Sequence, residues 1–222
     1  MTVQALIIDF DGVLIESEYD GNRHLAELLT DLGHPTAVDD ALANFTGLSG
    51  EDFVAAVEAR IGARLPEGFH TRRAAENERV LASGVPAVEG AIAFIRSLPA
   101  DLPKAVASSS TVRWVRTHLH HLGLGYAFGD HIYSGREHVE RGKPAPDLYI
   151  YAAQQLGVPI ADCTIIEDSE VGARGAVASG ARVIGLVAGS HCLPGHDARL
   201  QALGVRDIAY SFDDIRRLLE LG

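Results

Sequence analysis

The chain has 222 residues, a net charge of −11 and an apolar fraction of 47%, and these values exclude several classes of protein. A chain with this apolar fraction can bury a sizeable core and is not disordered. Its length fits one large domain or two unequal ones. The acidic balance argues against a nucleic-acid-binding protein, because such proteins need basic patches to neutralise phosphates. A small anionic substrate needs only one or two local cations and is compatible with this charge.

The N-terminal apolar run begins at Val3 and ends at Asp9, which is too short to cross a membrane. The two cysteines, Cys163 and Cys192, are too few for a disulfide framework. We therefore expect a soluble, cytoplasmic protein that does not bind a membrane. The sequence leaves its oligomeric state open.

The first expected element is a strand over residues 3–9, which runs into the sequence Asp-Phe-Asp-Gly. Residues i and i+2 of a strand point to the same face, so this pattern predicts Asp9 and Asp11 side by side at the strand tip. Two carboxylates that close repel each other unless a cation lies between them or they share a proton. The alternative is a solvated acidic turn.

Residues 17–84 contain no convincing strand and show helical patterns instead. These patterns are RHLAELLTDLG, DDALANF, EDFVAAVEARIG and HTRRAAENERVLASG. We expect residues 17–84 to form an inserted helical domain, with the core built from residues 1–16 and 85–222. Two linkers, near residues 14–18 and 82–87, would join this domain to the core, and Gly84 and Pro86 in the second linker suit a hinge.

From about residue 103 onward, short apolar runs alternate with helical patterns. The runs are KAVASS from Lys104, HIYS from His131, CTIIED from Cys163, RVIGLV from Arg182 and DIAYS from Asp207. Strand–helix alternation implies right-handed crossovers and a parallel sheet covered by helices, so the expected fold class is α/β.

Polar side chains cluster where the expected strands end, which is where open parallel sheets bind ligands. They are Asp9, Asp11, Ser108, Ser109, Ser110, Lys143, Glu167 and Asp168. Each has an ordinary explanation alone: the serines suit a helix N-cap, the lysine an exposed surface, and the acids a solvated strand end. Four groups of polar residues at successive strand ends would rarely arise by chance, so together they predict one site.

Four motifs carry a resemblance to a known family: DFDGV at Asp9, the serine ending KAVAS at Ser108, the lysine of GKPAPD at Lys143, and IIEDS at Glu167 and Asp168. The chain resembles the haloacid dehalogenase (HAD) superfamily over its whole length. It is most similar to the β-phosphoglucomutase and sugar-phosphatase subgroup, whose helical cap is inserted after the first strand. The resemblance implies a parallel-sheet, Rossmann-like HAD core with residues 17–84 as an all-helical cap.

The resemblance also implies the roles of the site residues. Asp9 would be the nucleophile, and Asp11 the general acid and base. Mg²⁺ would be held by Asp9, Asp11 (through its backbone carbonyl) and Asp168, and the phosphoryl group by Ser108, Ser109 and Lys143. Glu167 is either a metal ligand or a residue that orients a coordinated water.

The implied activity is Mg²⁺-dependent hydrolysis of a small phosphomonoester, such as a sugar phosphate or sugar-acid phosphate, through an aspartyl-phosphate. The acid at Asp11 favours phosphoryl transfer over dehalogenation. The main alternative is a phosphosugar mutase of the β-phosphoglucomutase type, but its cap arginine and histidine positions hold Gly50 and Gly21 here. A non-catalytic binding protein is a further alternative, which the complete set of motifs disfavours.

Other polar residues are less specific candidates for a functional site. Arg23 and Glu18, at the cap entrance, are candidates to contact the substrate, and His24 lies nearly one helical turn from Gly21. The loop GSHCLPGH contains His191, Cys192 and His196, all of which could be zinc ligands. We favour a core loop beside the mouth of the site.

Overall fold

The computed structural model describes residues 3–48 and 50–220, and six strands in these ranges form one sheet. The strands are β1 (Ala5–Ile8), β2 (Lys104–Ser108), β3 (Ile132–Ser134), β4 (Cys163–Glu167), β5 (Arg182–Leu186) and β6 (Asp207–Ala209). Their order is β3-β2-β1-β4-β5-β6, and every neighbouring pair is parallel. The predicted α/β class is confirmed.

Strand β1 lies between β2 and β4, and all four of its residues are buried. Ile8, its last residue, is in register with Val106 of β2 and Ile166 of β4. A parallel strand covered on both faces reads as a continuous apolar run, which is the pattern of residues 5–8. The chain therefore leaves the centre of the sheet as it reaches Asp9.

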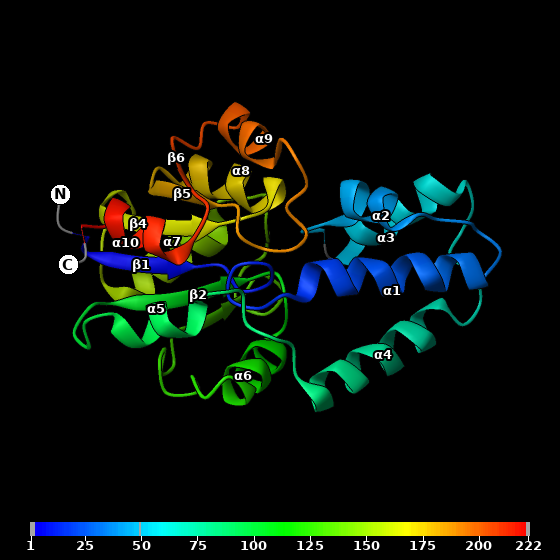
Figure 1. Cartoon of the computed structure of the whole chain (residues 1–222), viewed down its shortest axis with the longest axis horizontal. Coiled ribbons are helices and arrows are strands. Elements are labelled where there is room, and N and C mark those ends of the chain that lie inside the picture. Colours follow the sequence, from blue (N-terminus) through cyan, green and yellow to red (C-terminus); the bar gives the residue numbers. More distant parts are fainter. Residues whose placement is uncertain (1–2, 49, 221–222) are drawn as a thin grey trace.

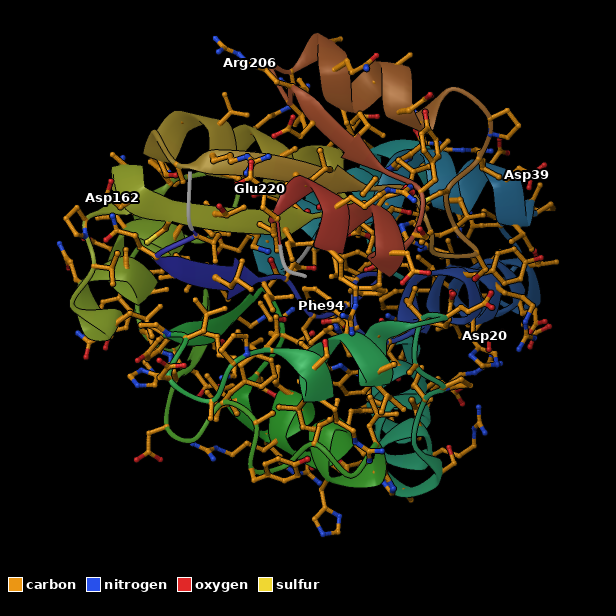
Figure 2. The ribbon with its side chains drawn as sticks, turned by 60° about the vertical axis from the view of Figure 1, so that its left-hand side comes forward. Asp20, Asp39, Phe94, Asp162, Arg206 and Glu220 are labelled. Atoms are coloured by element: carbon orange, nitrogen blue, oxygen red, sulfur yellow. The ribbon has the colours of Figure 1, made fainter. Side chains whose placement is uncertain are left out.

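Helices cover both faces of the sheet (Figure 1). On one face lie α5 (Ala91–Ser97), α6 (Val112–His121) and α10 (Phe212–Leu218), and on the other α7 (Asp147–Leu156), α8 (Glu170–Ser179) and α9 (His196–Ala202). A short 3₁₀ helix, Ile160–Asp162, precedes β4. Phe94 of α5 packs on Phe212 of α10 with ring centroids 5.1 Å apart (Figure 2).

Four helices fill the chain between β1 and α5 and have a core of their own. They are α1 (Ser17–Asp31), α2 (Val38–Phe45), α3 (Gly50–Ile61) and α4 (Phe69–Ser83), here called the helical segment. Leu29, Phe45, Val57 and Phe69 are buried in that core. The arrangement is compatible with the expected cap at residues 17–84, and the domain boundaries stay a prediction. Ser49, which directly precedes the Gly50 position compared with the mutase, lies outside the described residues.

The helical segment lies beyond the end of the sheet at which β1 finishes (Figure 1). In Figure 2, Asp20 and Asp39 of the segment are far from Asp162, which directly precedes β4. The carboxyl ends of the strands, and the polar residues that follow them, therefore face the helical segment.

The two chain passes that join the helical segment to the sheet are hydrogen-bonded to each other. The amide of Glu16 donates to the carbonyl of Pro86 at 2.9 Å, and the amide of Val88 donates to Leu14 at 3.1 Å. Ile15 and Ala87 form an antiparallel bridge between them. The passes thus form a short two-stranded ribbon.

Within the ranges that the structure describes, no helix combines the length and apolar character needed to span a membrane. The cytoplasmic location stays a prediction.

Candidate active site

A cleft of about 780 Å³ separates the ends of the strands from the helical segment. Asp9, Asp11 and Lys143 line its floor. The opposite wall comes from the helices α1, α3 and α4, and its side chains include Glu18, Arg23, His24, Phe53 and Arg73. The cleft can therefore hold a small molecule between a floor of charged residues and a helical wall.

Asp9, Lys143 and Glu167 form a buried ion-pair network on the floor. Nζ of Lys143 lies 2.5 Å from Oδ1 of Asp9 and 2.7 Å from Oε1 of Glu167. The side chains are 3% exposed for Lys143, 8% for Asp9 and 1% for Glu167. Burial raises the pKa of Asp9 well above its usual value, and the ammonium group of Lys143 offsets part of that rise. Lys143 is therefore the local cation that this acidic site requires.

Glu167 is held in place by a dense set of donors. Its Oε2 accepts hydrogen bonds from the backbone amides of Asp168 and Ser169, and its Oε1 from the hydroxyl of Tyr149 at 2.9 Å. Burial alone would raise the pKa of Glu167, but Lys143 and these donors bring it below the usual value. Gly172 leaves room for the carboxylate, because a Cβ there would lie 1.7 Å from Oε1.

Asp168 is buried and contacts two histidines of the loop after β5. Nε2 of His191 lies 2.7 Å from Oδ2 of Asp168, and Nε2 of His196 donates to the Asp168 carbonyl at 2.5 Å. Burial alone would lower the pKa of His191, yet the Asp168 carboxylate raises it to about 11. Oδ1 of Asp168 is also buried and has no hydrogen-bond partner among the described residues.

The acidic groups on the floor fit a hard divalent cation. Asp9, Glu167 and Asp168 each offer a carboxylate oxygen, and these oxygens lie within 4.8 Å of one another. Mg²⁺ in proteins takes one or two carboxylates and completes its shell with water and substrate oxygens. Glu167 already accepts hydrogen bonds from five donor groups. Asp9 and Asp168, the latter with an unpartnered oxygen among the described residues, are therefore the better-fitting ligands.

Asp11 has a different environment from Asp9, because β1 ends at Ile8 and the alternation of strand side chains does not reach these acids. The chain turns there: the amide of Leu14 donates to the carbonyl of Phe10, and Gly12 has a φ of +80°. The strand geometry that predicted Asp9 and Asp11 side by side therefore does not extend to these two residues.

Four side chains donate hydrogen bonds to the Asp11 carboxylate. The donors are Ser17 at 2.8 Å, Trp114 at 2.9 Å, Ser110 at 2.8 Å and Ser108 at 3.2 Å. Ser108 is fully buried, whereas Ser109 and Ser110 line the cleft. The structure thus brings all the predicted site residues to one end of the sheet, with Ser108 facing Asp11.

Gly12 is required by close approach as well as by its backbone conformation. A Cβ at this position would lie 2.0 Å from Oδ2 of Asp168 and 2.9 Å from the ring of His191. A positive φ is also strained for any residue with a side chain. The glycine after the two acids therefore lets the first loop pass directly beside Asp168.

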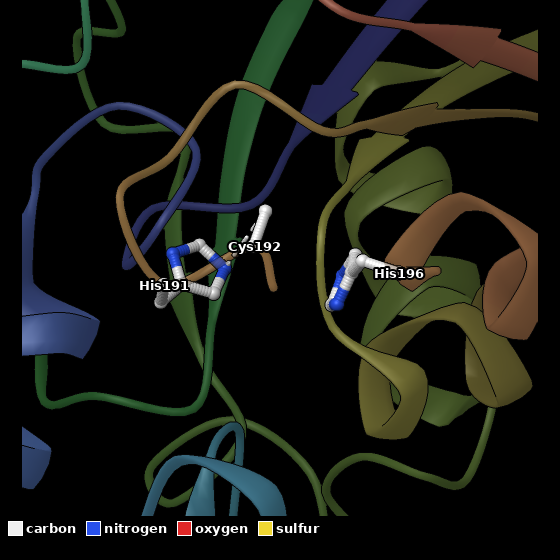
Figure 3. Close-up of side chains that lie close together, drawn as sticks. All are labelled: His191, Cys192 and His196. Carbon is white, nitrogen blue, oxygen red and sulfur yellow. Dashed lines mark hydrogen bonds between the residues drawn. The ribbon is translucent and has the colours of Figure 1, made fainter. Parts of the chain in front are cut away.

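Two residues of the segment from Gly189 to His196 contact Asp168. Figure 3 shows these residues, His191 and His196, together with Cys192. His191, Cys192 and His196 do offer ligand atoms within 4.8 Å of one another, and Sγ of Cys192 lies 3.5 Å from Nε2 of His191. Both imidazoles, however, use Nε2 to contact Asp168. This geometry favours a support for Asp168 over a zinc site.

Three residues that contribute to the cleft or its floor could not be identified from a motif or pattern in the sequence. Tyr149 and Trp114 belong to helices α7 and α6 and hydrogen-bond Glu167 and Asp11, respectively. Arg73 belongs to α4 and lines the cleft. The candidate Arg23 also lines it, but its guanidinium is paired with Asp20 and Glu27. Only a tertiary structure brings these helices to the strand ends.

Comparison with known proteins agrees with this site. The model of the haloacid dehalogenase-like hydrolases matches residues 3–180. The chain belongs to this family. It is 27% identical to 6-phosphogluconate phosphatase of Escherichia coli, over 86% of each chain, and 30% identical to hexitol phosphatase A of the same organism, over 83% of each chain.

A solved HAD family hydrolase from Deinococcus radiodurans, with bound phosphate and sodium, is 32% identical to the chain. It superposes with a TM-score of 0.77 over 97% of this chain and 94% of that protein. Together with the phosphatase names of the relatives, the family confirms the predicted fold and the predicted enzyme class, an HAD-type phosphomonoesterase hydrolase.

Proposed function

We propose that the protein catalyses Mg²⁺-dependent hydrolysis of a small phosphomonoester through an aspartyl-phosphate on Asp9. The observation that carries this proposal is that Asp9 and Lys143 pair on the floor of a cleft, with a carboxylate oxygen of the buried Asp168 within 4.8 Å of one of Asp9. Phosphoryl transfer requires a nucleophile and positive charge that neutralises the oxygens of the transferred group. This arrangement supplies a carboxylate, a fixed cation and oxygens that can bind a metal ion.

Asp9 would attack the phosphorus atom, forming the bond between its carboxylate oxygen and phosphorus while the bond to the ester oxygen breaks. Lys143, 2.5 Å from Oδ1, fixes the orientation of the Asp9 carboxylate. Splitting hydrolysis into two displacements replaces one difficult step by two easier ones.

Asp11 would donate its proton to the departing alkoxide and then take a proton from the water that attacks the aspartyl-phosphate. That second displacement releases inorganic phosphate and restores the Asp9 carboxylate. Asp11 lies at the edge of the cleft, beside the site that the leaving group would occupy. Hydrogen bonds from Ser17, Ser110 and Trp114 hold its carboxylate there.

Asp9 and Asp168 would hold the Mg²⁺ ion, with the backbone carbonyl of Asp11 as the third protein ligand that the family resemblance implies. When bound, the ion supplies positive charge that lowers the repulsion between the carboxylate nucleophile and an anionic phosphoryl group. His191 and His196 orient Asp168 for this purpose.

The size of the cleft and the names of the relatives support a phosphorylated sugar, sugar alcohol or sugar acid as the substrate class. The test is a screen of phosphorylated metabolites with Mg²⁺, in which inorganic phosphate is measured. Release of phosphate without a bisphosphate activator supports the proposal.

A phosphosugar mutase is the second candidate, because an arginine, Arg73, lines the helical wall where a mutase would bind a second phosphate. The two positions expected to carry mutase donors, Gly21 and Gly50, also line the cleft and provide no side chain. Conversion of β-glucose 1-phosphate to the 6-phosphate with little free phosphate would identify a mutase.

A further inference from the structure

Arg73 differs from every other arginine of the helical segment. The other five form ion pairs: Arg23 with Asp20 and Glu27, Arg60 with Asp40, Arg64 with Glu58, Arg72 with Asp31, and Arg79 with Glu76. Among the residues that the structure describes, none provides Arg73 with a carboxylate partner. Its charge is therefore available to a ligand.

The guanidinium of Arg73 lies in the cleft with weak contacts only. Its Nη1 is 3.5 Å from the carbonyl of Gly21, and its Cζ is 5.7 Å from the centre of the Phe53 ring. Burial lowers the pKa of Arg73, although Glu76 and Glu18 act in the opposite direction. A guanidinium has five N–H donors, so this half-buried one has lost part of its hydration without gaining matched acceptors.

The surroundings of Arg73 favour a ligand with a single negative charge. Glu76 already pairs with His24 at 2.9 Å and with Arg79, and its negative charge acts on the pKa of Arg73. This acid would repel a phosphate dianion more strongly than a carboxylate ligand. A carboxylate also matches the guanidinium fork through two parallel hydrogen bonds.

We infer that Arg73 is a specificity-determining residue that binds a carboxylate at the end of the substrate opposite the phosphate. The preferred substrates are then phosphorylated carboxylic acids, such as sugar-acid phosphates, over neutral sugar phosphates. The inference rests on the proposed phosphatase function, since Asp9 and Lys143 must bind the phosphoryl group on the floor while Arg73 binds the far end.

The test compares 6-phosphogluconate with glucitol 6-phosphate, which have the same carbon chain and phosphate position and differ in the carboxylate at carbon 1. Wild type should have the higher kcat/KM on the acid. Arg73→Gln should reduce the ratio of the two kcat/KM values about 10- to 100-fold, chiefly through KM for the acid, since a charge-assisted pair contributes about 1.5–3 kcal/mol. Arg73→Lys keeps the charge but not the forked pair of donors, so its ratio of kcat/KM values should lie between those of wild type and Arg73→Gln.

Arg72→Gln is the matched control, because Arg72 is adjacent in sequence, pairs with Asp31 and does not line the cleft. It should leave the ratio at the wild-type value. Urea unfolding of each variant checks that the helical segment is folded.

Two failures are distinguishable. If wild type releases no phosphate from either compound or from the metabolite panel, the proposed function is wrong. If wild type releases phosphate but Arg73→Gln keeps the wild-type ratio, or wild type prefers the neutral compound, the role of Arg73 is wrong. A preference for a bisphosphate that Arg73→Gln abolishes would replace the carboxylate by a second phosphate.

Discussion

Nε2 of His191 lies 2.7 Å from Oδ2 of Asp168, and both side chains are 1% exposed. The contact joins the loop after β5 to the end of β4, so an acid expected to bind the metal is oriented by a histidine from another part of the chain. Partners of this kind fix the direction in which a ligand presents its free oxygen.

His191→Ala should therefore weaken Mg²⁺ binding about 10- to 100-fold, as measured by isothermal titration calorimetry, because residues that orient ligands have effects of this size. His120→Ala, an exposed position on α6, is the control. An unchanged Mg²⁺ affinity in His191→Ala would show that Asp168 does not depend on this contact.

Asp168→Ala should remove most Mg²⁺ binding and activity, because it deletes one of the two carboxylates that best fit the ion. Chelation of wild type should abolish phosphate release, and added Mg²⁺ should restore it. Full activity after exhaustive chelation would contradict the metal assignment.

Asp9→Asn should lower kcat by at least about 10³-fold, because an amide is a poor nucleophile and loss of a nucleophile commonly costs this much or more. The near-isosteric change should leave the circular dichroism spectrum unaltered. Asp162→Asn, far from the cleft and exposed, is the control. Residual turnover above a few percent would remove Asp9 from this role.

Lys143→Met should lower the free energy of unfolding by about 3–5 kcal/mol, because Asp9 and Glu167 would be left buried without their cation. Urea denaturation without Mg²⁺ measures this loss. Lys104→Met should have a much smaller effect, because within the described ranges the Lys104 ammonium donates a hydrogen bond only to the carbonyl of Leu102. Equal effects of the two substitutions would contradict the network.

Glu18 should make the free energy of unfolding depend on pH. Burial raises its pKa to about 7, so the folded chain holds a proton that the unfolded chain has released, and stability falls as pH rises from about 4.5 through 7. Glu18→Gln removes this loss. Its stability advantage over wild type should therefore be larger at pH 8.5 than at pH 4.5, by at most about 3 kcal/mol.

Urea denaturation at the two pH values, without Mg²⁺, measures the Glu18 effect. Glu67→Gln, an exposed acid just before α4, serves as the control and should show no such trend. A constant difference between wild type and Glu18→Gln at all pH values would mean that Glu18 titrates normally.

The strands and their parallel arrangement could be predicted because buried parallel strands read as unbroken apolar runs. Helices α5, α9 and α10 were not predicted, since each has seven residues and two turns are too short to establish a helical period. Asp9, Lys143 and Asp168 could be found because their positions follow from where strands end.

The rest of the site depends on contacts between distant parts of the sequence. Trp114 donates to Asp11 across 103 positions, and Arg73 reaches Gly21 across 52. A local pattern of residues cannot encode such pairings. For the same reason, the sequence favoured a core loop over a zinc site at His191, Cys192 and His196 but did not indicate that the two histidines contact Asp168.

The ribbon formed by Leu14–Glu16 and Pro86–Val88 has a mechanical consequence. Because the two passes are bonded to each other, a displacement of one is transmitted to the other, so any rotation of the helical segment relative to the sheet should move both passes together. Such a rotation would change the separation between Arg73 of the helical segment and Asp9 at the end of β1. The spacing of these two groups would then set the length of a substrate that contacts both at once.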